Sequence, residues 1–135
     1  MGKVVVCEDD TTIQKLIRAG LRITGHAVRI ASDGAEGLRL IEQDRPDLIV
    51  TDVSMPNVDG FQLGDALRAR PELRDIPLLF MTASVESDAI EECYRHGATA
   101  YLAKPFTIGD LRQRIDDLIR AKADGVSVSG EAPSA

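Results

Sequence analysis

The chain has 135 residues, which is enough to bury one sizeable hydrophobic core in a single domain. With 44% hydrophobic and 28% charged residues, it has the composition of a soluble globular protein. A net charge of −6 argues against direct nucleic-acid binding, which requires a basic surface, and no apolar stretch reaches the roughly 20 residues of a membrane helix.

The N-terminal sequence and the cysteines both favour a cytoplasmic protein. The apolar run that begins the chain is too short, and too soon followed by acids, to be a signal peptide. Cys7 and Cys93 each lie among apolar residues, so we expect two small buried side chains rather than a disulfide. We therefore expect a cytoplasmic location and no membrane partner.

Five short runs rich in β-branched and apolar residues predict strands. In chain order they are residues 3–7, 28–31, 48–52, 78–82 and 99–103. The third run, Leu-Ile-Val-Thr-Asp, is almost continuously apolar until its last residue. Such a run is typical of a strand covered on both faces, as in a parallel sheet.

A helix is predicted after each strand, from apolar residues at helical spacing and from capping residues. The predicted N-terminal caps are Thr11 with Gln14, Asp33 with Glu36, Asp59, and Thr107 with Asp110, and the predicted stops include Gly25 and Gly97. The third helix, residues 61–70, contains Gly64, which costs about 1 kcal/mol relative to alanine. The fourth helix is predicted over residues 87–96.

Strand and helix therefore alternate five times, with connections of ordinary length. This alternation predicts an α/β fold, a doubly wound five-stranded parallel sheet with right-handed crossovers and helices on both faces. Residues 123–135 are small and polar, and we expect them to form a disordered tail or the start of a linker.

Polar residues stand at, or directly after, the carboxyl ends of four of the five predicted strands. The first strand ends at Glu8 and Asp9, the third at Asp52, the fourth at Thr82 and the fifth at Lys104. In open α/β sheets, ligands bind beyond the carboxyl ends of the strands. These residues are therefore the candidates for a functional site, although spacing alone does not fix the order of the strands in the sheet.

The segments that carry these residues resemble the receiver domain of bacterial two-component response regulators over residues 3–122. They are Val-Val-Val-Cys-Glu8-Asp9-Asp10, Thr51-Asp52-Val-Ser-Met-Pro56 with Asp59-Gly60, Met81-Thr82-Ala83, and Gly97-Ala-Thr-Ala-Tyr101-Leu-Ala-Lys104-Pro105-Phe106. All four in this order and spacing are highly specific. The resemblance implies a receiver domain at residues 1–122, the flavodoxin-like strand order 2-1-3-4-5 and a cis bond before Pro105.

The implied order puts the first and third strands side by side, roughly 4.8 Å apart, so that Glu8, Asp9 and Asp52 would converge. Three carboxylates repel one another, and Mg²⁺ suits them because it prefers hard oxygen ligands and a phosphate. By the resemblance, Mg²⁺ is held by Asp9, Asp52 and the backbone carbonyl of Ser54, with Glu8 acting through water.

The resemblance also implies the chemistry. Asp52 would be the phosphoacceptor, receiving a phosphoryl group from a sensor histidine kinase or a histidine phosphotransfer protein in a Mg²⁺-dependent step. Lys104 would neutralise the phosphoryl oxygens and Thr82 would hydrogen-bond them. Tyr101 matches the family's switch aromatic. Thr82 and Tyr101 would form the switch, since Thr82 would draw the loop after the fourth strand inward and Tyr101 would turn into the space vacated. This would change the face made by the fourth helix, fifth strand and fifth helix, which contacts an unknown downstream protein.

Simpler interpretations exist for some of these residues. Acids after the first strand are favoured at a helix N-terminus by the helix dipole, although Asp52 and Lys104 argue against that explanation alone. Tyr101 could be an ordinary packed strand aromatic. His26 and His96 lie beside glycines and are interpreted as solvated loop or helix-end residues.

Two other functions compete with the signalling switch. A Mg²⁺-dependent phosphohydrolase that forms an aspartyl phosphate, of the haloacid dehalogenase type, uses a second Asp two residues after the first, where this chain has Ser54. A receiver that only binds partners is disfavoured because every chemical residue is present. We therefore expect a switch that catalyses only its own phosphorylation and dephosphorylation, either a single-domain protein or the receiver fragment of a larger multidomain regulator.

Overall fold

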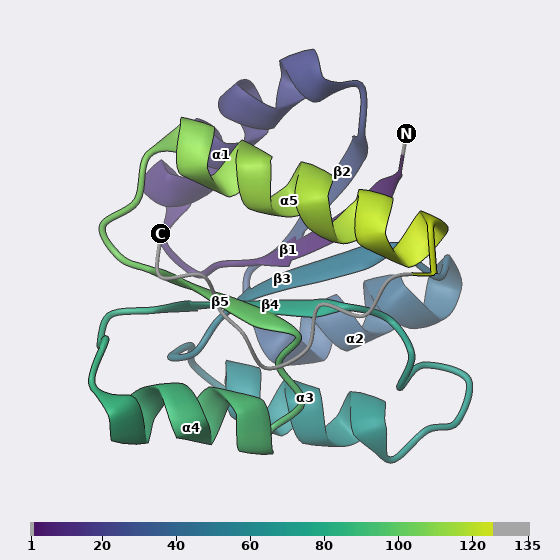
Figure 1. The fold of residues 1–135 in the computed structure, drawn as a ribbon, viewed down its shortest axis with the longest axis vertical. Coiled ribbons are helices and arrows are strands. Elements are labelled where there is room, and N and C mark those ends of the chain that lie inside the picture. The colour runs from purple at the N-terminus through teal and green to yellow at the C-terminus, as the bar shows by residue number, and fades with distance from the viewer. Residues whose placement is uncertain (1, 126–135) are drawn as a thin grey trace.

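The computed structural model describes residues 2–125, in which strands and helices alternate as the sequence predicts (Figure 1). The strands are β1 (Lys3–Cys7), β2 (Ala27–Ala31), β3 (Leu48–Asp52), β4 (Leu78–Thr82) and β5 (Ala100–Ala103). The helices are α1 (Thr11–Leu21), α2 (Gly34–Gln43), α3 (Gly60–Arg68), α4 (Ser87–Arg95) and α5 (Ile108–Ala123), with a 3₁₀ turn, η1 (Arg22–Thr24), after α1. Every predicted strand is confirmed to within one residue at either end.

The strands form one parallel sheet in the order β2-β1-β3-β4-β5. This confirms the doubly wound fold and the flavodoxin-like order. The register aligns the carboxyl ends of the central strands, since Cys7 pairs with Thr51 and Asp52 pairs with Met81. Residues that follow these strands therefore meet at one edge of the sheet.

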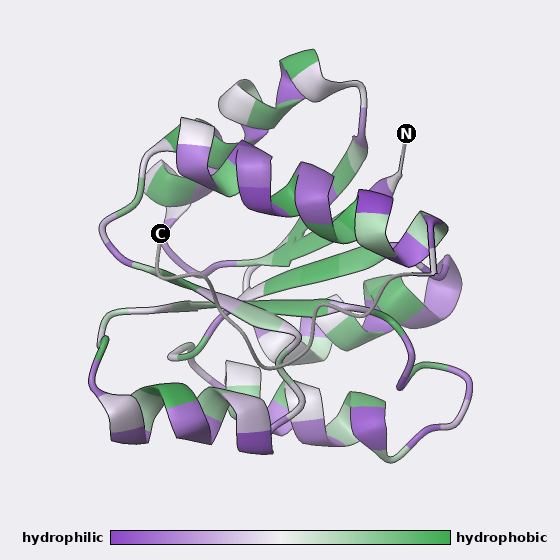
Figure 2. Ribbon diagram, in the orientation of Figure 1, coloured by the Kyte–Doolittle hydropathy of each residue, from purple (hydrophilic) through white to green (hydrophobic). Residues whose placement is uncertain are grey.

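Helices cover the sheet on both faces, with α1 and α5 on one face and α2, α3 and α4 on the other (Figure 1). The helices contribute Ile17, Leu21, Leu111, Ile115 and Leu118 to the first core, and Ile41, Leu63, Leu67 and Cys93 to the second. The strands between them are strongly hydrophobic, while the outer helix surfaces carry most of the polar residues (Figure 2). Burial of these apolar side chains on two faces is the main stabilising contribution to the fold.

Two glycines allow α3 to approach its neighbours closely. A Cβ on Gly60 would lie 2.2 Å from the carbonyl oxygen of Asp52, and one on Gly64 would lie 2.1 Å from that of His96. Both distances are well inside van der Waals contact. Gly64 therefore offsets its poor helix propensity by letting α3 pack against the end of α4.

Two of the predicted caps differ in the structure. The N-cap of α1 is Asp10, whose carboxylate accepts hydrogen bonds from the amides of Thr12 and Ile13, so the predicted pairing of Thr11 with Gln14 is wrong. Asp10 takes this position because its short acidic side chain directly precedes the first turn.

The second difference concerns the pair Asp33 and Glu36. Asp33 caps α2 as predicted, but the Glu36 carboxylate accepts from the amide of Ser32 instead of closing the box on Asp33. The boxes at Asp59 and Thr107 form in full.

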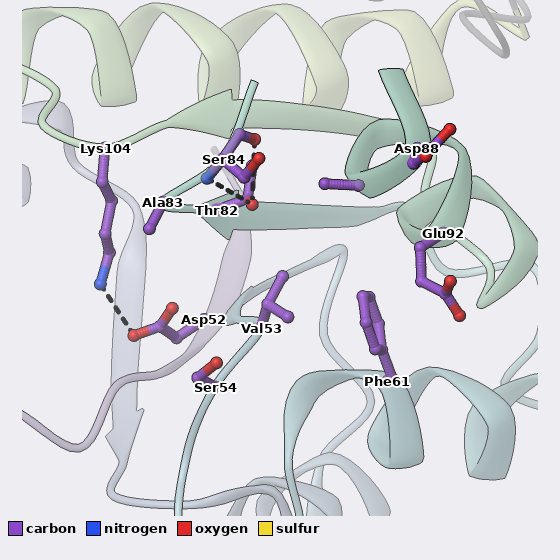
Figure 3. A pocket seen from close by; sticks show the side chains of 11 residues that line it. Asp52, Val53, Ser54, Phe61, Thr82, Ala83, Ser84, Asp88, Glu92 and Lys104 are labelled. Atoms are coloured by element: carbon purple, nitrogen blue, oxygen red, sulfur yellow. Dashed lines mark hydrogen bonds and ion pairs between the residues drawn. The ribbon is translucent and has the colours of Figure 1, made fainter. Parts of the chain in front are cut away.

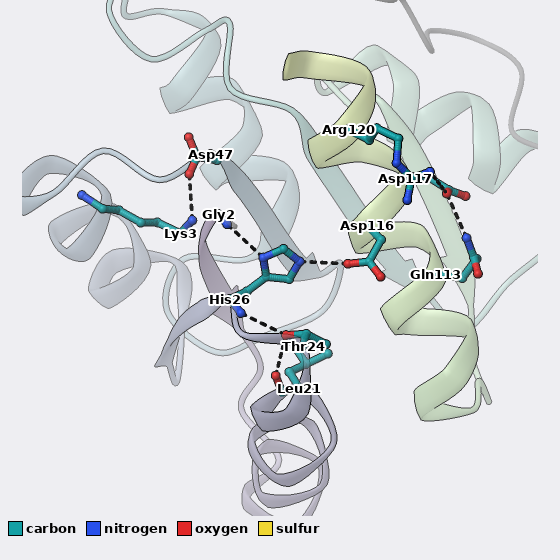
Figure 4. Close-up of polar contacts among 10 residues, drawn as sticks. All are labelled: Gly2, Lys3, Leu21, Thr24, His26, Asp47, Gln113, Asp116, Asp117 and Arg120. Atoms are coloured by element: carbon teal, nitrogen blue, oxygen red, sulfur yellow. Dashed lines mark hydrogen bonds and ion pairs between the residues drawn. The ribbon is translucent and has the colours of Figure 1, made fainter. Parts of the chain in front are cut away.

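Both histidines make specific contacts, which corrects their interpretation as solvated residues. The His26 side chain is only 9% exposed: its Nδ1 accepts from the Gly2 amide at 2.9 Å and its Nε2 lies 2.8 Å from Asp116 Oδ1 on α5 (Figure 4). His96 stacks on Phe61, with ring centroids 4.5 Å apart, and contacts Asp65 and Glu92. The contacts with Gly2, Asp116 and Asp65 could not be predicted from spacing because these residues are distant along the chain, whereas Glu92 lies one helical turn before His96.

The remaining sequence expectations concern the cysteines and the chain ends. Cys7 and Cys93 are both buried and free, as predicted, and burial raises the pKa of the Cys7 thiol to about 12 and that of Cys93 to about 11. No helix within residues 2–125 is long and apolar enough to cross a bilayer. Helix α5 ends at Ala123, and the expected tail lies, from residue 126 on, outside the described residues.

Candidate functional site

The acids predicted to converge do so at the carboxyl edge of the sheet. Asp52 is the last residue of β3, and Glu8 and Asp9 directly follow β1, its neighbour in the sheet. One carboxylate oxygen from each of the three lies within 4.8 Å of the others. Glu8 and Asp52 are buried, at 1% and 8% exposure, whereas Asp9 is exposed at the rim.

Lys104 closes this acidic cluster from the far side. It directly follows β5 and is joined to Pro105 by a cis peptide bond, as expected. Its Nζ lies 2.8 Å from Asp52 Oδ2 and 3.2 Å from Glu8 Oε1, so one ammonium group donates to two of the three carboxylates. The lysine side chain thus spans β4 to reach β3.

Burial and charge alter the titration of two of these groups. Burial raises the pKa of the Glu8 carboxyl above its ordinary value, and the negative charge of Asp52 adds to this, against the hydrogen bond from the Asp10 amide and the contact with Lys104. Burial alone would lower the pKa of Lys104, but its hydrogen bond to Asp52 and the charges of Asp52 and Glu8 outweigh that effect and raise it. Lys104 therefore stays protonated at neutral pH.

Asp52 and Lys104 lie at one side of a cleft of about 640 Å³ that extends between α3 and α4 (Figure 3). The cleft is lined by Asp52, Val53, Ser54, Phe61, Thr82, Ala83, Ser84, Asp88, Ala89, Glu92 and Lys104. Thr82 ends β4 beside Asp52, and its hydroxyl oxygen accepts a hydrogen bond from the Ser84 amide at 3.2 Å and lies 3.3 Å from the Ser84 carbonyl. The predicted residues Ser54 and Thr82 therefore share one cavity with the acid–lysine pair.

Tyr101 lies apart from this cleft. It is half-buried on β5, and its ring meets that of Tyr94 on α4 edge to face, with centroids 6.5 Å apart. Because side chains alternate along a strand, Tyr101 and Ala103 face the same side of β5, and Ala103 pairs with Thr82. The Tyr101 side chain thus lies between β5 and α4, on the face expected to respond to a change at Thr82.

The donor set fits a hard divalent cation. Three carboxylates share one lysine, which leaves an excess of negative charge when all are ionised, and Asp9 provides an exposed carboxylate at the edge of the sheet. Oxygen ligands of this kind, with room for water or phosphate beside them, suit Mg²⁺ better than softer metals. The residues present therefore fit the cation that the resemblance implies.

A doubly wound sheet of this order, with an acid–lysine pocket at its carboxyl edge, is the architecture of a receiver domain. The chain belongs to the response regulator receiver domain family, whose model matches residues 4–116. It is therefore a receiver domain of two-component signalling, a family of signalling switches.

Curated relatives support the same assignment. The transcriptional regulatory protein PrrA of Mycobacterium tuberculosis is 36% identical over 129 residues, which cover 96% of this chain and 54% of that protein. The response regulator MprA of Mycolicibacterium vanbaalenii is 37% identical over 121 residues, covering 87% and 50%. The chain thus spans about half the length of these curated relatives.

Solved structures agree closely with the fold. The chemotaxis response regulator CheY4 of Vibrio cholerae is 30% identical, with a TM-score of 0.83 over 87% of this chain and 98% of that one. The receiver domain of the sensor histidine kinase PA1611 of Pseudomonas aeruginosa is 31% identical, with a TM-score of 0.81 over 88% and 98%. That structure holds a magnesium ion coordinated in its active site cleft.

Sequence reasoning missed three residues around the site. Phe61 forms a wall of the cleft, Asp10 donates its backbone amide to Glu8 Oε2 at 3.0 Å, and Gln14 on α1 hydrogen-bonds the loop that carries the acids. Asp10 directly follows Glu8 and Asp9 in the sequence, and this position could have indicated its place beside the site. The role of Gln14 depends on how α1 is placed against β1, which the local sequence does not specify.

Proposed function

We propose that this receiver domain is a phosphorylation-controlled switch in which Asp52 accepts the phosphoryl group. The observation that carries the proposal is the pairing of the buried Asp52 carboxylate with Lys104, 2.8 Å away, beside two further carboxylates within 4.8 Å. A carboxylate held between a lysine and an acidic cation site can act as a nucleophile toward phosphorus.

The transfer needs little beyond positioning and charge compensation. A carboxylate oxygen of Asp52 attacks the phosphorus of a phosphohistidine, the P–N bond breaks, and the imidazole leaves with the bonding electron pair and takes up a proton. Lys104 then donates from its ammonium group to a phosphoryl oxygen, and Thr82 turns its hydroxyl from Ser84 to another.

Asp9, Asp52 and the backbone carbonyl of Ser54 would hold the cation, and Glu8 would contact it through water. Mg²⁺ bound there would offset the negative charge on the phosphoryl oxygens. Lys104 alone neutralises only one of the three clustered carboxylates, so we expect the transfer to depend on the metal.

The output would be a change of the face formed by α4, β5 and α5. When Thr82 turns toward the phosphoryl group, the loop between β4 and α4 follows it, and Tyr101 turns inward beside Thr82. Phosphorylation would thus bias a two-state surface that a downstream protein reads.

The phosphoryl donor would be a cytoplasmic sensor histidine kinase domain or a histidine phosphotransfer protein. The switch would catalyse only its own phosphorylation and dephosphorylation. Because the chain spans about half of its curated relatives, it acts in this proposal either by itself or as the receiver of a larger regulator.

The proposal is tested by incubating the protein with Mg²⁺ and phosphoramidate and measuring its intact mass. We expect one added phosphoryl group per chain, lost with EDTA and absent from Asp52→Asn. Asp88→Asn is the matched control, because Asp88 lines the same cleft outside the acidic cluster. Labelling that survives Asp52→Asn, or sustained hydrolysis of a simple phosphate ester, would contradict the proposal.

A further inference from the structure

Gln14 connects α1 to the loop that carries the acids. Its side-chain Nε2 donates to the backbone carbonyl of Glu8 at 2.5 Å and lies 3.3 Å from Ser32 Oγ, at the end of β2. The residue is half-buried and points inward from the first turns of the helix. It therefore contacts the backbone next to the acids without reaching their carboxylates.

The carbonyl that Gln14 binds belongs to the peptide plane between Glu8 and Asp9. On one side of this plane the Glu8 amide donates to the carbonyl of Ala31 at 2.9 Å. On the other side the Asp10 amide donates to Glu8 Oε2 at 3.0 Å. The bond from Gln14 adds a third fixed point, so that the orientation of the plane, and with it the direction of the Asp9 side chain, is determined.

Asp9 depends on this support more than its neighbours do. Glu8 is held by Lys104 and by the Asp10 amide, and Asp10 by its capping bonds. Among residues 2–125, by contrast, nothing hydrogen-bonds or forms an ion pair with the Asp9 carboxylate. Its position is set by the backbone alone.

We propose that Gln14 is a positioning residue for the cation site: by holding the Glu8–Asp9 peptide plane, its amide aims the Asp9 carboxylate at the cation shared with Asp52. The inference rests on the proposed Mg²⁺ site and adds a residue to it that lies outside the acidic cluster. Groups that orient metal ligands from behind typically change metal affinity by 10- to 100-fold when removed, and we expect a loss near the lower end, about tenfold.

A merely structural role for Gln14 predicts something different. If its amide only fastened α1 to the sheet, replacing it would lower stability and leave the Mg²⁺ affinity of the folded protein unchanged. A purely electrostatic effect predicts another result, because an added negative charge near the site would strengthen Mg²⁺ binding. Gln14→Glu separates these effects because it keeps the shape, removes the N–H donor and adds a charge.

The test is Mg²⁺ titration by isothermal calorimetry of the wild type, Gln14→Leu and Gln14→Glu, with urea unfolding in EDTA measured in parallel. Gln113→Leu is the matched control, since within residues 2–125 the Gln113 amide bonds only Asp117, on the exposed side of α5. We expect the Mg²⁺ dissociation constant to rise about tenfold in both Gln14 variants and to stay unchanged in Gln113→Leu. The backbone amide signal of Asp9 in metal-free NMR spectra should shift in the Gln14 variants only.

The outcomes separate the two proposals. Wild-type protein that binds no Mg²⁺ would overturn both the cation site and the role of Gln14. Wild-type binding that is lost in Asp9→Asn but unchanged in both Gln14 variants would overturn the role of Gln14 alone. Tighter Mg²⁺ binding by Gln14→Glu would also overturn the role of Gln14, because the affinity would then not depend on the amide donor.

Discussion

The ammonium group of Lys104 lies 2.8 Å from the carboxylate of Asp52, although 52 residues separate them in the sequence. The same group lies 3.2 Å from Glu8, so that a single cation is shared by acids from two strands. Lys104 thus offsets one of the three negative charges at the site, and its removal gives the most direct prediction.

Lys104→Met is expected to destabilise the metal-free protein by about 2 kcal/mol. The variant leaves the buried carboxylates of Glu8 and Asp52 without the lysine ammonium group. The loss of folding free energy is smaller than for a fully buried ion pair because Lys104 is 22% exposed. Urea unfolding in EDTA measures the loss, and added Mg²⁺ should restore part of it. The variant should still accept a phosphoryl group at Asp52.

Lys3→Met is the matched control for this measurement. Lys3 pairs with Asp44 at 2.9 Å, but both side chains are about half exposed, so its loss should cost much less. Equal costs for the two lysine variants would show that the buried position of Lys104 carries no special weight.

Gly64→Ala is expected to destabilise the protein by about 2 kcal/mol, although alanine is the better helix former. The added Cβ would lie 2.1 Å from the His96 carbonyl oxygen, so α3 must move away from the end of α4. Gly109→Ala in the first turn of α5 is the control, because its Cβ would meet nothing closer than Thr107 Oγ1 at 3.7 Å. Thermal unfolding should show a loss for the first variant and none for the second.

The contacts of His96 predict a pH-dependent contribution to stability. The hydrogen bond to Asp65 at 2.7 Å, helped by Glu92 at 3.1 Å, raises the pKa of His96 above its ordinary value. A group whose pKa is raised on folding stabilises the folded state below its unfolded pKa, about 6.5, and this contribution is lost as pH rises through the folded value.

The measurement compares urea unfolding of the wild type and His96→Gln at pH 6 and pH 9. The advantage of the wild type should be larger at pH 6, and Asp65→Asn should remove most of the difference. An advantage that stays constant or grows at pH 9 would show that stacking on Phe61, not the charged pair, is what His96 contributes.

His26→Leu is expected to cost about 1 to 3 kcal/mol. Because the Gly2 amide donates to Nδ1, the hydrogen of the neutral ring lies on Nε2 and is donated to Asp116. Leucine removes both hydrogen bonds and leaves the buried Gly2 amide without an acceptor. Chemical denaturation checks the loss. Asp117→Ala, next to Asp116 but on the exposed side of α5, should be nearly neutral, and a neutral His26→Leu would contradict the assignment.

The site could largely be predicted from the sequence because its residues stand at the ends of easily recognised strands. Apolar runs lead directly into Glu8, Asp52 and Thr82, and the parallel order then brings their ends together. The reach of Lys104 across β4 follows from the same order and from the length of its side chain. These positions depend on short local patterns and on the rule that ligands bind beyond the carboxyl ends of the strands in an open α/β sheet.

Contacts made between elements could not be predicted in this way. Gln14 has the spacing of a capping residue for Thr11, yet its amide finds the Glu8 carbonyl, because a half-buried donor is satisfied by whatever acceptor the packing of α1 against β1 provides. The same holds for the contacts of His26 with Gly2, just before β1, and with Asp116 on α5, and for the contact of His96 with Asp65 on α3. Local spacing carries no information about such neighbours.

Strand β5 is one of the two outer strands of the sheet, and Lys104 follows it directly. Its amine pairs with Asp52 at the end of the central strand β3 and with Glu8 after β1. One flexible side chain therefore connects the outer strand to the middle of the sheet. In the proposed switch, a change of charge at Asp52 would therefore change the force that Lys104 exerts on the outer strand, without requiring the central strands to deform.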